Sequence, residues 1–135
     1  MNEAPIGIVL TDPLETDEPI VYANGAFTTL TGYETHAVVG RDRGILWGED
    51  TAAGALAELR TAIDDREPAT VELRSYRKDG EEFWNRVRVA PLFDDEGDLD
   101  FFVEFHEDVT ERKRDEERLQ SPPRGSKPSS STRRT

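Results

Sequence analysis

The stretch "TVELRSYRKDGEEFWNRVRVAPLFDDEGDLDFFVEFHEDV", residues 70–109, decides the fold. Apolar and polar residues alternate through much of it, and a period of two places successive side chains on opposite faces of a β-strand. Two acidic segments that contain glycine interrupt the pattern, "KDGEE" at 78–82 and "DDEGD" at 94–98. Such segments form tight turns, because glycine tolerates the positive φ that hairpins need. The stretch therefore predicts three antiparallel strands.

Each of these strands has a face suited to a protein interior. The shared faces are Val71, Leu73 and Ser75 in the first strand, and Phe83, Asn85, Val87 and Val89 in the second. The last strand, 99–109, has two competing faces. They are Leu99, Phe101, Val103 and Phe105 on one side, and Phe102, Glu104 and His106 on the other. Hydrophobicity alone favours burial of the first of these sets.

Two further strands are predicted upstream, "IGIVLTD" at 6–12 and "PIVYAN" at 19–24. The segment "NGAFTTLTGY" then predicts a short helix, which Asn24 is suited to cap and Gly32 to end. A second helical turn is expected in "THAVVG", residues 35–40.

The longest helix is predicted for "EDTAAGALAELRTAIDD", residues 49–65. Its expected buried residues are Ala53, Leu56, Leu59 and Ile63. Glu49 and Asp50 stand before it as expected capping charges rather than metal ligands. Two strands, short helices, one longer helix and three antiparallel strands together predict an α+β fold, with a five-stranded antiparallel sheet and helices on one face.

The composition limits the function. With 135 residues the chain is long enough for one domain, and its net charge of −12 opposes binding of nucleic acid. No cysteine is present, so a disulfide, a thiolate metal site and a thiol nucleophile are excluded. Fourteen of the 17 bases are arginine. An acidic, lysine-poor composition is typical of haloarchaeal proteins that work in molar salt, and an ordinary acidic bacterial protein is the alternative.

Charge also divides the chain into parts. Residues 1–110 carry 25 acids and nine bases, whereas residues 111–135 carry four acids and eight bases. We expect one domain over 4–110, a helix over 111–120, and a disordered tail rich in Pro, Ser and Arg over 121–135. No 18-residue apolar run and no basic, apolar N-terminal signal are present, so the expected location is the cytoplasm and no membrane partner is expected.

The order of elements, together with "YANGAFTTLTGY", "FWN" and "DEGDLDFFVEFHEDVTERK", resembles a PAS domain with its PAC segment. Within that family, "TDP" at 11–13, "GED" at 48–50, "LRTAI" at 59–63 and "YRKDGEEFWN" at 76–85 resemble the LOV subfamily of flavin blue-light sensors. The resemblance implies a PAS fold. It also implies that "DVTERK" passes a signal from Asp108 and Thr110 into an exit helix.

The LOV pattern "GRNCRFLQG" corresponds to "GRDRGILWG" at 40–48, in which Leu46 is retained. Arg43 stands where the resemblance places the photoactive cysteine, so the cysteinyl–flavin bond cannot form. Asp42 and Trp47 replace an asparagine and a glutamine, and Gly44 replaces an arginine that clamps the flavin phosphate. The second phosphate arginine of the family corresponds to Arg60.

Further flavin contacts come from the strands. The resemblance places Thr11, Phe102, Glu104 and His106 at the pocket, and it matches Ser75 and Asn85 to two asparagines that bind the polar edge of the flavin. Glu104 and His106 stand where the family has glycine and glutamine. Asn85 is equally explained as a core amide, Ser75 as an ordinary strand residue and Arg60 as a solvated charge. His106 is either a structural residue or a pH-sensitive one.

These features predict a sensory and signalling module that is not an enzyme and that acts by association with proteins. Trp84, Phe101, Val103 and Phe105 are the expected interface, with a second copy or another signalling protein as partner. One version has no cofactor and a pocket filled by its own side chains. The alternative version binds a small molecule, FMN, and signals through flavin reduction.

Overall fold

The computed structural model describes residues 5–120, and for Arg43 and residues 118–120 it describes only the backbone. The predictions for residue 4 and for the tail 121–135 lie outside this range. The described strands are β1 (Ile6–Thr11), β2 (Ile20–Ala23), β3 (Ala69–Tyr76), β4 (Glu82–Phe93) and β5 (Leu99–Asp108). The helices are α1 (Gly25–Thr31), α2 (Thr35–Val38), the 3-10 turn η1 (Arg43–Leu46), α3 (Ala53–Asp65) and α4 (Thr110–Gln120).

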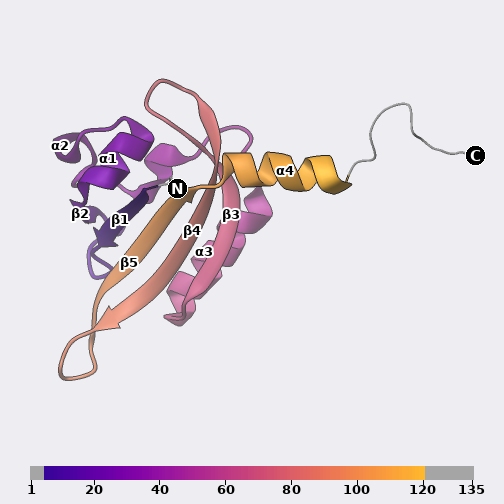
Figure 1. The fold of residues 1–135 in the computed structure, drawn as a ribbon. Coiled ribbons are helices and arrows are strands. Elements are labelled where there is room, and N and C mark those ends of the chain that lie inside the picture. Colours follow the sequence, from indigo (N-terminus) through magenta and orange to yellow (C-terminus); the bar gives the residue numbers. More distant parts are fainter. Residues whose placement is uncertain (1–4, 121–135) are drawn as a thin grey trace, which may run out of the picture.

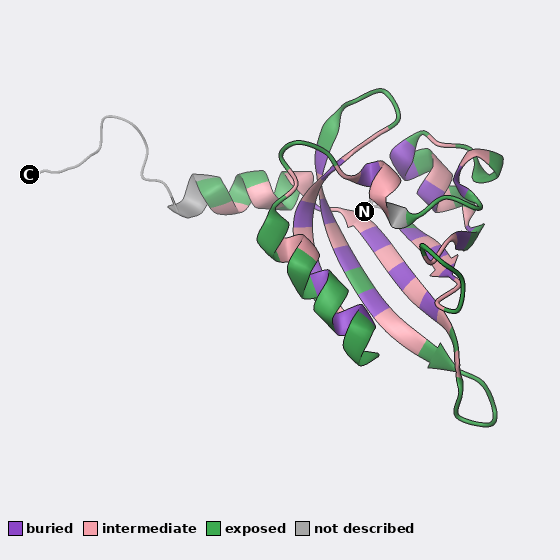
Figure 2. Ribbon diagram, turned by 180° about the vertical axis from the view of Figure 1, so that it is seen from behind, coloured by how far each residue is buried: buried purple, intermediate pink, exposed green. Residues whose placement is uncertain are grey.

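The five strands form one antiparallel sheet in the order β2-β1-β5-β4-β3, which confirms the predicted fold class. Helices α1, α2 and α3 lie on one face of this sheet, the inner face (Figures 1 and 2). The opposite face, the outer face, is turned toward the viewer in Figure 1, and none of the helices described between residues 5 and 120 lies along it. Helix α4 starts where β5 ends and projects away from the sheet (Figure 1).

Local signals in the sequence explain the short helices. The Asn24 side chain accepts a hydrogen bond from the Phe27 amide at 2.9 Å, and Gly32 ends α1 at a φ of 81°, as predicted. Gly80 has a φ of 91° in the turn between β3 and β4, where glycine was expected. Turn chemistry is therefore decided locally in this chain.

Helix α3 corrects two predictions. It begins at Ala53, which is exposed, and the buried residues of its second half include Ala62 beside Leu59 and Ile63. Glu49 and Asp50 do not cap it, because the N-cap is Ala52 and no side chain bonds there. The loop before α3 is instead tied to β3, since the Thr51 hydroxyl donates to the Arg74 carbonyl at 2.7 Å.

The core consists of two apolar clusters beneath the helices. The α3 cluster comprises Leu59, Ala62, Ile63, Val71, Leu73, Val87, Val89 and Phe102. The α1–α2 cluster comprises Val9, Ile20, Ala23, Phe27, Val38 and Leu46. Along β5 the buried residues are Phe102, Glu104 and His106, so the register implied by the family resemblance holds and the one favoured by hydrophobicity alone does not. Buried and less buried positions alternate along the central strands in Figure 2.

Close packing of α1 on β1 gives the first testable prediction. A Cβ atom at Gly7 would lie 2.9 Å from the Cα of Phe27, a backbone atom that cannot turn aside. We expect Gly7→Ala to lower the free energy of unfolding by about 1–3 kcal/mol, measured by urea denaturation. Gly25→Ala is the control, because a Cβ there meets nothing within 4 Å and alanine favours the helix. Equal losses in both variants would contradict the predicted contact.

Candidate functional site

Four buried polar side chains on the inner face form one connected group, called here the polar chain: Ser75, Asn85, His106 and Glu104. Asn85 Nδ2 donates to Ser75 Oγ at 3.2 Å and lies 3.0 Å from His106 Nδ1. His106 Nε2 lies 3.1 Å from Glu104 Oε1. Exposure of these residues is between 0% and 4%, so water does not compete for these contacts.

Hydrogen-bond logic fixes the direction of the polar chain. Asn85 Oδ1 accepts from the Glu107 backbone amide at 3.2 Å, which sets the orientation of the Asn85 side chain. Its Nδ2 can only donate, so Nδ1 of His106 is an acceptor. The proton of the neutral ring then lies on Nε2 and is donated to Glu104. The four side chains thus contact one another in a line from Ser75 to Glu104, and Asn85 also holds the backbone of β5.

Aromatic side chains enclose the polar chain. The ring of Phe27 packs edge-on against His106, with centroids 5.2 Å apart. Trp47 is half-buried and packs against both core clusters, so its indole spans the space between α3 and the α1–α2 side. Leu46 and Phe102 are fully buried, as is Thr11. Sequence reasoning did not single out Phe27 as a neighbour of the site.

A groove of about 500 Å³ opens beside Trp47. Its lining is mostly acidic and comprises Glu15, Asp17, Glu18, Asp42, Gly44, Trp47 and Arg60. Arg60 lies 3.8 Å from Glu18, and the Asp42 carboxylate accepts from the Gly44 amide at 2.9 Å to cap η1. Arg43 opens η1, and its side chain lies outside the described part of the structure.

The predicted site residues therefore fall into two places. Thr11, Leu46, Ser75, Asn85, Phe102, Glu104 and His106 are buried inside, whereas Asp42, Trp47 and Arg60 line the groove. That Ser75, Asn85, His106 and Glu104 contact one another was not predicted. Their alternation on three neighbouring strands was visible in the sequence, but the contacts depend on how those strands pair.

At the exit, Asp108 and Thr110 lie together at the start of α4. The Thr110 amide and hydroxyl donate to Asp108 Oδ1 at 2.9 and 2.6 Å, and the hydroxyl accepts from the Trp84 amide at 2.9 Å. Arg77 pairs with Asp108 Oδ2 at 2.8 Å. Burial raises the pKa of Asp108, but hydrogen bonds from Thr110 and Arg77 outweigh this and hold the pKa below its ordinary value. Sequence analysis missed Arg77.

The fold, together with the exit residues 108–110, matches a known protein family. The model of the PAS domain family matches residues 5–111. The chain is a PAS domain. It is 41% identical over 120 residues to the bacterioopsin transcriptional activator of Halobacterium salinarum, covering 89% of this chain and 18% of that protein. It is 37% identical over 110 residues to a blue-light photoreceptor of Listeria monocytogenes, covering 82% of this chain and 43% of that protein.

Solved structures of LOV domains are also similar to this PAS domain. The LOV domain from an Erythrobacter litoralis blue-light activated histidine kinase is 38% identical with a TM-score of 0.75, and the match covers 78% of this chain and 97% of that one. The light-state structure of the Aureochrome1 LOV photoreceptor is 36% identical with a TM-score of 0.77, covering 85% and 88%. The PAS domain thus spans nearly the whole of each LOV domain, but less than half the length of the two curated relatives above.

The residues of this PAS domain do not fit a bound FMN. Ser75, Asn85 and His106 satisfy one another, so their polar atoms are not directed toward a flavin edge. Trp47 packs between the two clusters. The described lining of the groove presents four carboxylates, and its arginine, Arg60, is paired with Glu18, so these groups would repel a phosphate. No mechanistic step is therefore assigned to a flavin.

Between residues 5 and 120, no three His, Cys, Asp or Glu side chains are placed to hold a metal ion. None of the described helices is long and apolar enough to cross a membrane.

The second prediction concerns Asn85. Asn85→Ala removes the partner of Ser75 Oγ, His106 Nδ1 and the Glu107 amide at once, so we expect a loss of about 2–4 kcal/mol in the free energy of unfolding. Ser75→Ala removes one contact and should cost about 1 kcal/mol. Urea denaturation measures both. A loss for Asn85→Ala no larger than that for Ser75→Ala would show that the polar chain does not stabilise the sheet.

Proposed function

We propose that this PAS domain is a signalling module that acts by association with proteins and without flavin photochemistry. The observation that carries the proposal is that the side chains of the polar chain contact one another in the place where the LOV resemblance expects flavin contacts. The absence of cysteine agrees with it. Its blue-light relatives indicate a sensory role in the broad sense. The module itself is proposed to have no enzyme activity.

The proposed interface is the outer face around Trp84, Phe101, Val103 and Phe105. All four side chains are half-buried. Phe101, Val103 and Phe105 follow one another on β5, and Trp84 lies on the adjacent strand β4 beyond the Arg86–Glu107 pair. Exposed apolar residues extend the patch, with Ile6 and Leu92 exposed by 37% and 40%. An apolar surface of this kind is a typical binding site for another protein. The proposed partner is a second copy or another signalling protein, neither nucleic acid nor membrane.

The alternative function is that of an FMN-binding sensor that signals through flavin reduction. Identity of 38% to a LOV domain favours it, as do the retained Asn85 and Arg60. It requires the contacts within the polar chain to break, because Asn85 and His106 face one another instead of a ligand.

A cytoplasmic location and adaptation to high salt remain predictions. The acidic composition and the Halobacterium relative support the adaptation to high salt.

Light absorption separates the two functions. The purified protein should show no flavin absorption band. Added FMN should not bind, because the groove is acidic and Asn85 and His106 already contact one another. Blue light should produce no adduct. Arg43→Cys alone should not create one, since Asp42, Gly44, Ser75 and His106 are unchanged. Co-purified flavin, identified by mass spectrometry, would establish the alternative function instead.

Association is tested by light scattering in molar salt, where exposed charges are screened beyond about 3 Å. The wild type should be a dimer, and Phe101→Glu with Phe105→Glu should make it a monomer, because two charges would be buried in the interface. Leu14→Glu with Val39→Glu is the matched control, since both side chains are exposed and lie outside the four-residue interface. A monomeric wild type would refute self-association.

A further inference from the structure

Helix α4 begins with an unfavourable run of charge. Three bases, Arg112, Lys113 and Arg114, follow one another near its start, the first two of them in its first turn. The N-terminus of a helix carries a partial positive charge from its unpaired amides, so cations placed there are repelled. Glu111 offsets one of them at most. This turn therefore needs negative charge from another part of the fold.

Glu72 of β3 provides that charge from the outer face. Its Oε2 atom accepts from Arg112 NH2 and, at 3.2 Å, from Arg86 Nε, while Oε1 lies 3.1 Å from Lys113 Nζ. The side chains of Glu72 and Lys113 are 25% and 23% exposed. Burial raises the pKa of Glu72, but hydrogen bonds from Lys113, Arg112 and Arg86 outweigh it and lower the pKa. One carboxylate thus holds three cations from two elements.

Beyond this contact little holds α4 to the domain. Every residue from 111 to 117 is charged, so this part of the helix has no apolar face to bury. Lys113 adds a cation–π contact, with Nζ 4.6 Å from the centre of the Trp84 ring. The start of the helix is also attached through the Asp108–Thr110 cap and through the Trp84 amide, which donates to the Thr110 hydroxyl. Figure 1 shows the rest of α4 running away from the sheet.

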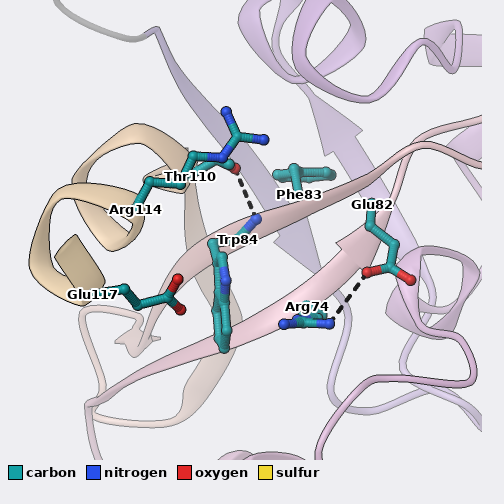
Figure 3. A pocket seen from close by; sticks show the side chains of 7 residues that line it. All are labelled: Arg74, Glu82, Phe83, Trp84, Thr110, Arg114 and Glu117. Carbon is teal, nitrogen blue, oxygen red and sulfur yellow. Dashed lines mark hydrogen bonds and ion pairs between the residues drawn. The ribbon is translucent and has the colours of Figure 1, made fainter. Parts of the chain in front are cut away.

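The start of α4 also borders a pocket that the protein does not fill. A pocket of about 270 Å³ lies between α4 and the β3–β4 hairpin (Figure 3). Its lining comprises Arg74, Glu82, Phe83, Trp84, Thr110, Arg114 and Glu117. In Figure 3 the Trp84 ring stands in this pocket, between Arg74 of β3 and Glu117 of α4. Beside this pocket, the charge contacts of Arg112 and Lys113 with Glu72 contribute to where the helix lies.

The same contacts reach through the sheet to the polar chain. Arg86 follows Asn85 in β4, and its NH1 lies 3.8 Å from Glu107 Oε1. The backbone amide of Glu107 in turn donates to Asn85 Oδ1. A change at Asn85 on the inner face therefore acts on Arg86, which contacts Glu72 on the outer face, and on Glu107, which pairs with Arg86.

We propose that Glu72 is an electrostatic latch that fixes the first turn of α4 on the sheet, and that loss of its charge releases the helix while the domain stays folded. The latch is the point at which the domain controls its exit helix. This role rests on the proposed signalling function, and it identifies the residue on which regulation acts.

Hydrogen exchange of the full chain, read by mass spectrometry, tests the latch. In Glu72→Gln the amides of 111–117 should exchange about five- to tenfold faster than in the wild type, because charge-assisted contacts are lost, whereas β4 and β5 should be unchanged. Asp100→Asn is the control, as it changes the net charge equally on an exposed residue of β5. Unchanged exchange at 111–117 would overturn the proposal, and so would equal acceleration throughout the domain.

A second set of variants avoids any effect on the folding of the sheet. Arg112→Gln with Lys113→Gln should accelerate exchange at 111–117 as Glu72→Gln does, and combining all three should add nothing further. Arg114→Gln removes the next cation along the helix without touching the latch, so it should not accelerate exchange. Additive effects, or acceleration by Arg114→Gln, would overturn the latch. Flavin absorption and light scattering of the same samples report separately on the proposed function.

Discussion

The register of β5 between β1 and β4 is the constraint on which the rest of this structure depends. His106 pairs with Gly7 on one side and Val87 on the other, and Glu104 pairs with Val9 and Val89. A shift of one residue would turn Phe102, Glu104 and His106 outward and bring Phe101, Val103 and Phe105 inside. The core would gain apolar surface by that shift. The observed register therefore has to be held by contacts that the shifted one would lose.

The polar chain provides those contacts. Asn85 accepts a hydrogen bond from the backbone of β5 and contacts His106. Both contacts depend on how β4 is aligned with β5, so they stabilise the observed alignment. His106 and Glu104 can be buried only because each meets a polar partner at hydrogen-bond distance. Gly7 completes the arrangement, since α1 comes so close to β1 that a side chain there would meet Phe27. Specific polar contacts, rather than the amount of apolar surface, select this register.

How much of this could be predicted from the sequence depends on the range of each signal. Asn24, Gly32 and Gly80 act within a few residues, so the turns and caps they form were predicted correctly. The start of α3 was not predicted correctly. Thr51 bonds to Arg74 across the fold, and this contact holds the residues before Ala53 as a loop. The face of β5 required the family resemblance, since hydrophobicity pointed the other way. The contact between Asn85 and His106 joins residues 21 apart, and only strand pairing brings them together.

Polar side chains are paired differently on the two faces of β4, by buried hydrogen bonds on the inner face and by partly solvated ion pairs on the outer face. Inside, neutral donors and acceptors are arranged in a line from Ser75 to His106, with Glu104 at its end, where an unpaired charge would be costly. Outside, Glu72, Arg86 and Arg112 are charged and partly solvated, so their contacts are individually weaker and easier to break. Successive residues Asn85 and Arg86 belong one to each system. A rigid polar core joined through one strand to a weakly held helix is an arrangement in which a small change inside can alter the position of the exit without unfolding the sheet.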